Sequence, residues 1–396
     1  MKRRGPWIVG VALAVAAGIA GAGALGACGD GVPRPPAMDP VSADEAATLA
    51  REFDAAIEPC DADRLEKLFD SETVARRIVN KADIPASEKR GGLNELQRRN
   101  FSVARQLCLG FVSAARFDLL RIRQNGATHR PLFRMLTDGT VNYYDLELGK
   151  SKTSGVVRIV DLYVYTSGED LTTTLAGLIE QGLAAERRGQ TVAGFQDLAS
   201  ARREGDWAEV RRIAEAMPER VRNTKAVRLV ELQAAMEQDA PDYLAIIERF
   251  EKDFPDDPAV DLVAIDGHFL RKDLPALMRV IERLERRVGG DPYLAHVRSS
   301  GYLLEPTNDN LEKAERWSRV TLDALPDVQD VWWNLATAQL QRQDHVAVVA
   351  TLETIRTRFG VTFDRDAMAE QDIYQRFLVS PEFAGWWARV NGATGP

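Results

Sequence analysis

Apolar residues in the C-terminal half of the chain recur every three or four positions. The set that begins at Tyr243 and ends at Phe254 occupies positions i, i+3, i+4, i+7 and i+11, which is the period of an amphipathic helix. A second set of this kind runs from Leu277 to Val288, and an Asp-Pro pair follows each set. Prolines stand at a constant interval of 34 residues: Pro258, Pro292 and Pro326. This period predicts helical hairpins that stack into a solenoid with one continuous core.

The best-defined unit spans residues 330–359. Its first helix carries Trp332, Leu335 and Ala336 on one stripe, and a second apolar stripe follows a short turn. These positions resemble the tetratricopeptide repeat, and the resemblance extends over residues 190–362 in about five units. A plain irregular helical bundle is the alternative.

A solenoid of this kind implies a trough that holds a protein or peptide partner. The first helix of each unit lines the trough, and five residues are expected to face the partner: Phe269, Leu303, Trp333, Thr337 and Leu340. An inward tryptophan is a natural anchor for a partner. The alternative places both Trp332 and Trp333 in the core. The residues that follow, 363–396, are expected to form capping helices and a tail.

The segment of residues 41–187 has a different pattern. Helices come first: Ser42 and Glu45 form a capping-box pair at the start of one helix, and a longer helix is expected over residues 93–111. Alternating apolar residues and tight-turn signals then predict antiparallel strands. The expected strands cover residues 117–124, 129–137, 140–148 and 156–165.

This order of elements resembles the nuclear transport factor 2-like (cystatin-related) α+β cone. The expected fold is therefore an α+β cone-like domain, with helices and then a four-stranded antiparallel meander, followed by an all-α tetratricopeptide-like solenoid. Members of the cone fold include enzymes, ligand binders and dimerisation modules, so the resemblance assigns no activity. The resemblance also makes a dimer of the protein, formed through the α+β domain, one expectation.

The last expected strand carries Asp161 among apolar residues. In a cone, the concave face can form a pocket, and five residues are candidates for its lining: Asp118, Tyr143, Asp145, Asp161 and Tyr163. An aspartate in an apolar pocket has a raised pKa and can act as a base. The favoured alternative is that Asp161 caps a helix or pairs with an arginine such as Arg134 or Arg158.

The N-terminus has the pattern of an export signal. Three basic residues precede an uncharged run rich in alanine and glycine, and the run ends in Leu-Gly-Ala before Cys28. Residues 1–27 with Cys28 resemble a bacterial lipoprotein signal, which implies cleavage before Cys28 and acylation of its thiol. Several acyl chains hold a protein stably on a membrane. Residues 28–40 then form a spacer rich in proline and glycine. Glycine rather than aspartate follows Cys28, which favours the outer membrane of the cell envelope, facing the periplasm. An uncleaved N-terminal helix is the alternative.

The charge of the chain argues against nucleic acid as a partner. The full chain carries −8, and residues 1–27 contribute three positive charges and no acid, so the mature chain carries −11. An acidic body binds nucleic acid poorly. The four histidines are isolated from one another and from cysteines at metal-ligand spacings, so neither a metal site nor a cofactor is expected.

Two cysteines remain after Cys28. Cys60 and Cys108 both fall in the helical part of residues 41–187, and an oxidising periplasm would allow them to form a disulfide. Two buried thiols on separate helices are the alternative.

Together these patterns predict a membrane-anchored scaffold or adaptor and not an enzyme. The partner is a protein or peptide held in the helical-repeat trough, and the membrane contact is made through acylated Cys28. The runner-up function is a small-molecule-binding or hydrolytic protein that uses the pocket of the α+β domain.

Overall fold

The computed structural model describes residues 32, 35–98, 101–110, 116–137, 140–186 and 193–392. Residues 1–27, which are expected to form an export signal, and Cys28 therefore lie outside the described residues. The chain divides into two compact units, one ending at Gly267 and one beginning at His268. No helix of the described residues is long and apolar enough to span a bilayer.

Helix α1 (Ala43–Ile57) opens the first unit and confirms the expected capping box. The backbone N–H of Glu45 donates to the Ser42 hydroxyl over 3.3 Å, and the backbone N–H of Ser42 donates to the Glu45 carboxylate over 3.0 Å. The apolar face of α1 is buried, and Phe53 contacts Phe133 of the sheet with ring centroids 5.0 Å apart. Helix α1 thus covers one face of the sheet.

Four short helices follow α1: α2 (Ala62–Glu66), α3 (Ser71–Lys81), α4 (Ala86–Arg98) and α5 (Val103–Gly110). The single helix expected over residues 93–111 is wrong, because Phe101 and Ser102 are not helical and a new helix starts at Val103. Ser102 gives the physical reason for the new start, since its hydroxyl accepts a hydrogen bond from the backbone N–H of Arg105. A serine that bonds its own backbone in this way favours a helix start over a helix interior.

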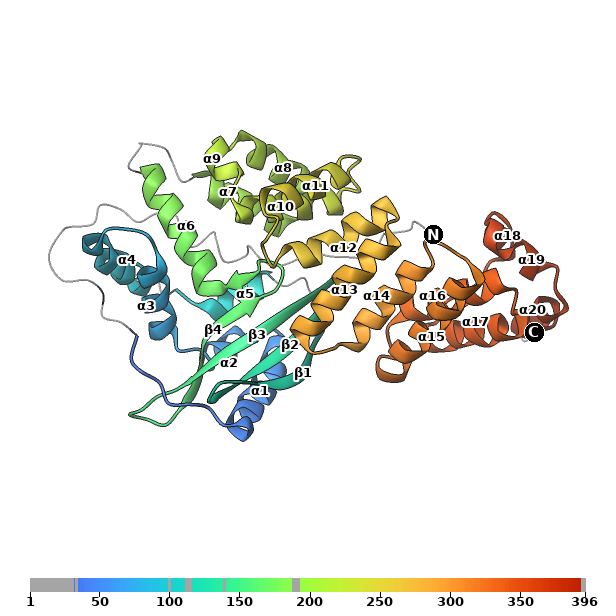
Figure 1. Cartoon of the computed structure of the whole chain (residues 1–396), viewed down its shortest axis with the longest axis horizontal. Coiled ribbons are helices and arrows are strands. Elements are labelled where there is room, and N and C mark those ends of the chain that lie inside the picture. Colours follow the sequence, from blue (N-terminus) through green and yellow to red (C-terminus); the bar gives the residue numbers. More distant parts are fainter. Residues whose placement is uncertain are drawn as a thin grey trace. The chain divides into compact units, whose positions relative to one another are not determined.

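The sheet confirms the expected antiparallel meander and adds one short strand. Its strands are β1 (Arg116–Asn125), β2 (Thr128–Thr137), β3 (Thr140–Lys150), β4 (Val157–Val164) and β5 (Glu169–Asp170). Each strand pairs with its neighbour in the sequence, as Figure 1 shows for the long strands. Gly126 takes a φ of +60° in the first turn, a conformation that favours glycine. Helices α3 and α6 (Leu171–Glu186) pack on β4 and on each other.

The described residues from Ala193 to the end of the first unit are mainly helical. They form α7 (Ala193–Glu204), α8 (Trp207–Ala216), α9 (Glu219–Arg222), α10 (Lys225–Glu237), α11 (Tyr243–Asp253) and most of α12 (Val260–Arg271). Lys225 at the start of α10 ties this part to the sheet, since its ammonium lies 3.0 Å from the Glu169 carboxylate and 2.8 Å from the Asp257 carboxylate. The sheet and these helices therefore belong to one compact unit.

The second unit is all-helical. Its long helices are α13 (Leu274–Val288), α14 (Pro292–Tyr302), α15 (Asn308–Ala324), α16 (Gln329–Arg342) and α17 (His345–Phe359). Each of them packs on the next one along the chain, and α14 also packs on α16. A C-terminal segment of short elements closes the unit: α18 (Arg365–Ala369), η2 (Asp372–Tyr374), α19 (Gln375–Leu378) and α20 (Pro381–Gly392).

Candidate functional site

The sheet brings the five residues expected for a pocket onto one face. In the strand register Asp118 stands beside Arg134, which stands beside Tyr143. Asp145 is likewise the cross-strand partner of Tyr163, and the neighbouring pair joins Glu147 to Asp161. Cross-strand partners point to the same side of a sheet. The five residues therefore share one face of the sheet.

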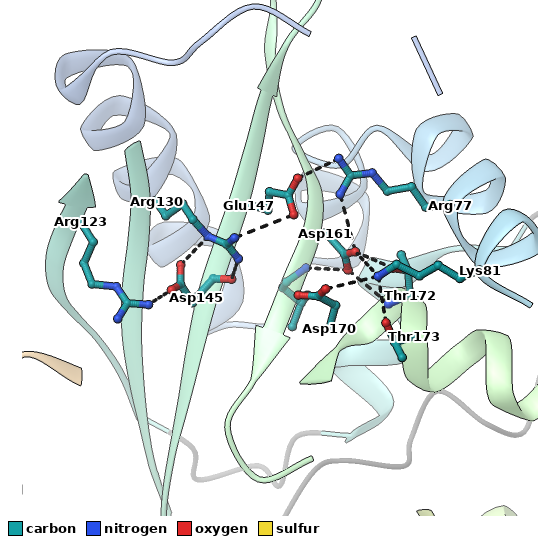
Figure 2. A network of polar contacts seen from close by, with 11 residues as sticks. Arg77, Lys81, Arg123, Arg130, Asp145, Glu147, Asp161, Asp170, Thr172 and Thr173 are labelled. Carbon is teal, nitrogen blue, oxygen red and sulfur yellow. Dashed lines mark hydrogen bonds and ion pairs between the residues drawn. The ribbon is translucent and has the colours of Figure 1, made fainter. Parts of the chain in front are cut away.

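Groups of α3 and α6 hold the Asp161 carboxylate (Figure 2). Its side chain is fully buried, with Lys81 Nζ at 3.4 Å and Arg77 Nη1 at 3.6 Å from the carboxylate. The carboxylate also accepts from the Thr172 hydroxyl over 2.5 Å and from the backbone N–H of Thr172 over 3.2 Å. Thr172 lies in the first turn of α6, so Asp161 caps this helix.

These contacts favour a structural role for Asp161. Burial raises the pKa of the Asp161 carboxyl, and the Thr172 hydroxyl and the Lys81 ammonium act in the opposite direction. The expected arginine partners, Arg134 and Arg158, are replaced by Arg77 and Lys81, which come from α3. A carboxylate that joins β4, α3 and α6 in this way is a cross-link between elements.

The charges continue along β3 as a chain of alternating sign. Arg77 donates to Glu147 over 2.8 Å, and Arg130 donates to Asp145 over 2.9 Å while lying 3.9 Å from Glu147. Burial raises the pKa of Glu147, but the hydrogen bond and charge of Arg77 outweigh it, so the pKa is lowered overall. The ion pairs of this network join the acids Asp145, Glu147, Asp161 and Asp170 to the bases Arg77, Lys81, Arg123 and Arg130 (Figure 2).

The other candidates on this face are also engaged. Asp118 pairs with Arg134 at 2.7 Å and with Arg116 at 2.8 Å. Tyr143 and Tyr163 both pack edge-on against Tyr165, with ring centroids 5.6 Å and 5.2 Å away. The arrangement can fasten helices to the sheet, and it offers substrate no aspartate without an ionic partner.

Sequence reasoning missed the cations that complete this network. Arg77 and Lys81 stand four residues apart on α3, so they lie on one face of that helix. Strand β4 presents an acid on a mostly apolar strand, and a buried acid needs a cation or several donors. The i, i+4 pair of cations was the signal that could have located its partners.

The residues expected to line the trough separate into two groups. The expectation that Leu340 faces the partner is wrong. Leu340 is only 5 % exposed and lies in one core with Ala336, Val348 and Leu352. It occupies the stripe of α16 that faces α17, which explains its burial. Trp333 is half-buried against the same core, and its ring centroid lies 6.1 Å from that of Phe363.

The second group keeps partial exposure. Phe269 on α12, Leu303 at the end of α14 and Thr337 on α16 are half-buried. Beside the last two, Asn334 on α16 donates from its amide to the Ser300 hydroxyl over 2.7 Å. We call Ser300, Leu303, Asn334 and Thr337 the strip of the second unit. Because all four are half-buried on two packed helices, the strip mixes polar and apolar groups that solvent can reach.

The histidine under this strip is interior. His296 is 2 % exposed, and its Nδ1 lies 3.1 Å from the Asn334 amide nitrogen. Burial lowers the pKa of His296 to about 3, so the ring is neutral near pH 7. His296 therefore supplies no positive charge to the strip.

In the structure, Cys60 and Cys108 form a disulfide, with their Cα atoms 5.5 Å apart. Within the described residues, no group of three or more histidine, cysteine, aspartate or glutamate side chains is placed to hold a metal ion. Comparison with family models, curated proteins and solved structures finds no match to this chain. Its function has to be argued from its own residues.

Proposed function

We propose that this chain is a lipid-anchored scaffold of the bacterial envelope that holds a protein or peptide partner on its helical second half. The observation that carries the proposal is the succession of helices α13 to α17, each packed on the next, with α14 also packed on α16. That pattern supports a tetratricopeptide-like solenoid, in which the first helix of one unit lies beside the first helix of the next.

Helix boundaries add support for the repeat. The residues that cap the N-termini of α13 and α15 are Asp273 and Thr307, which stand 34 residues apart. Both side chains accept a backbone N–H three residues further on. The same interval of 34 residues separates Ser300 from Asn334 and Leu303 from Thr337. The strip therefore consists of equivalent positions in two successive helical repeats. A surface built from equivalent positions suits an extended peptide or a helix of the partner.

We no longer propose that Trp333 and Leu340 contact the partner. Both are packed against the C-terminal segment, which occupies that end of the helical array. The proposed contacts are now Leu303 and Thr337, with Phe269 as the equivalent position one unit earlier.

The sheet domain supports the proposal because the aspartates on its face are held in ion pairs. We propose that this domain has a cone-like α+β fold. Its element order, with α1 covering one face of the meander, supports this. The ion pairs of Asp118, Asp145 and Asp161 favour a docking or dimerising module over a hydrolase.

Site-specific photo-crosslinking in native membranes tests the partner-binding strip. A photoreactive phenylalanine analogue is placed at Leu303, at Thr337 or at Val320, which is 43 % exposed on α15 and lies outside the strip. We expect Leu303 and Thr337 to give the same crosslinked protein and Val320 to give none of it. An identical pattern from all three sites, or no product from the strip, contradicts the proposed surface.

The membrane anchor has a separate test. Cys28→Ser removes the thiol that acylation requires, so we expect the protein to move from the membrane pellet to the soluble fraction, while wild type stays in the pellet. Metabolic labelling with a fatty-acid analogue should mark wild type alone. Label on the Cys28→Ser variant would refute acylation at this residue.

A further inference from the structure

The main attachments that the structure describes for helix α5 go to one part of the first unit. Its main packing partner is α2. The Ser102 hydroxyl at its start donates to the Glu66 carboxylate at the end of α2. Cys108 near its end is bonded to Cys60, just before α2. The apolar packing, the polar bond and the covalent bond therefore all join α5 to residues 60–66.

An eight-residue helix depends on such attachments. Isolated helices of this length are not stable in water. The side chains of α5 that face inward are Val103, Ala104 and Leu107, and each is at most 4 % exposed. These three side chains supply the apolar packing that the structure describes for α5, and the disulfide is the covalent one of the three attachments.

The surroundings of α5 are open to reagents. Cys60 and Cys108 are both half-buried. A cleft of about 370 Å³ lies beside α5, and its lining includes Glu66, Ser71, Ser102 and Arg105. Solvent therefore already reaches between α5 and α3.

We propose that the Cys60–Cys108 disulfide is a redox-sensitive latch, which a dithiol reductant opens to release α5 and uncover the apolar surface beneath it. The dithiol is oxidised to its own disulfide, the Cys60–Cys108 bond is reduced, and each cysteine sulfur takes up one proton as a thiol. The exchange passes through a mixed disulfide between the reductant and one of the two cysteines.

The sheet stays folded in this process. Its core residues Phe133, Leu146 and Leu162 are at most 1 % exposed, and α1, α3 and α6 are the helices that pack on the long strands. Helix α5 is not among the main packing partners of any described strand. Release of α5 thus differs from unfolding of the domain.

Hydrogen exchange on the full chain in detergent tests the latch. Exchange into peptides that cover α5 and into peptides that cover β3 is followed before and after excess dithiothreitol. We expect exchange in α5 to become at least tenfold faster on reduction and exchange in β3 to change less than twofold. Unchanged exchange in α5 overturns the proposal, as does equal acceleration in β3, which would make the disulfide a staple for the whole domain.

A double variant provides the matched control. Cys60→Ser with Cys108→Ser should show the fast α5 exchange without any reductant and should not respond to dithiothreitol. Thiol counting on the denatured, unreduced wild type checks the premise that Cys60 and Cys108 are joined. A count that includes both of them as free thiols would overturn it.

Discussion

The buried carboxylates of the sheet show how one residue can hold three elements. Asp161 lies on β4, binds Lys81 and Arg77 of α3, and caps the first turn of α6. Burial raises the pKa of Asp161, as it does for many general bases. Its neighbours, however, are the cations Arg77 and Lys81 of the protein itself. What distinguishes a catalytic acid from a structural one here is the set of partners, and those come from a helix eighty residues earlier in the chain.

Replacing Asp161 tests this role. Asp161→Ala leaves two cations and the start of α6 without their acceptor, so we expect a loss of about 3 kcal/mol in the free energy of unfolding. The matched control is Glu72→Ala, which removes the 62 % exposed acid of an i, i+4 pair with Arg76 and should cost less than about 0.5 kcal/mol. Denaturant titrations of both variants measure the difference. Equal losses would contradict the cross-link.

Glu353 predicts a pH dependence in the second unit. The Arg356 guanidinium first, and the Trp386 indole N–H second, lower the pKa of Glu353 from 4.5 to about 2. In the unfolded chain the pKa returns to its ordinary value, so the unfolded state takes up the proton at higher pH. The stability that Glu353 contributes is therefore present above pH 4.5 and lost as the pH falls toward 2.

The corresponding measurement compares wild type with Glu353→Gln. The difference in their free energies of unfolding should be largest above pH 4.5 and should vanish near pH 2, with tryptophan fluorescence as the readout of unfolding. A difference that does not vary with pH would show that Glu353 acts through its shape alone.

At the scale of elements, the β4–β5 turn closely approaches the α11–α12 loop at Gly168. Gly168 has a φ of +67°, and a Cβ built there would lie 2.5 Å from Asp257 Oδ1 and 2.6 Å from the backbone nitrogen of Ala259. Both the backbone conformation and the close approach require glycine.

Gly168→Ala is therefore expected to cost more than the conformational strain alone. Gly205→Ala is the matched control, because Gly205 has a φ of +72° and nothing within 4 Å of its added Cβ. We expect about 1 kcal/mol for the control and at least about 3 kcal/mol for Gly168→Ala, measured by thermal unfolding. Similar shifts for the two variants would mean that the loop moves aside without cost.

The sequence predicted those elements whose signal is local. The capping box at Ser42, the turn at Gly126 and the apolar stripe of α1 depend on residues a few positions apart. The break near Ser102 was missed because an apolar period continued through it. The partners of Asp161 and the burial of Leu340 depend on packing between distant segments, which no local pattern contains.

At the scale of the whole molecule, the C-terminal segment completes the second unit. Residues Phe377, Phe383 and Trp386 are at most 2 % exposed and share one core with α16 and α17. Helix α17 also packs directly on α20. The last helices thus protect the apolar face that a helical array exposes at its end.

Removing residues 361–396 should uncover that face. We expect hydrogen exchange in α16 and α17 to accelerate at least tenfold while exchange in β3 stays within twofold of wild type. A shorter truncation that removes only residues 393–396 should leave both regions unchanged. Preserved protection of α17 after the long truncation would show that the segment is dispensable.

The disulfide also closes a ring of main chain. Cys60 and Cys108 enclose α2, α3 and α4 in a covalent loop, and Arg98 and Arg105 are exposed within it. A trypsin cut at either arginine therefore severs the backbone without separating the two pieces. They would migrate together in non-reducing electrophoresis and part only after reduction, so a nicked chain would keep its full mass.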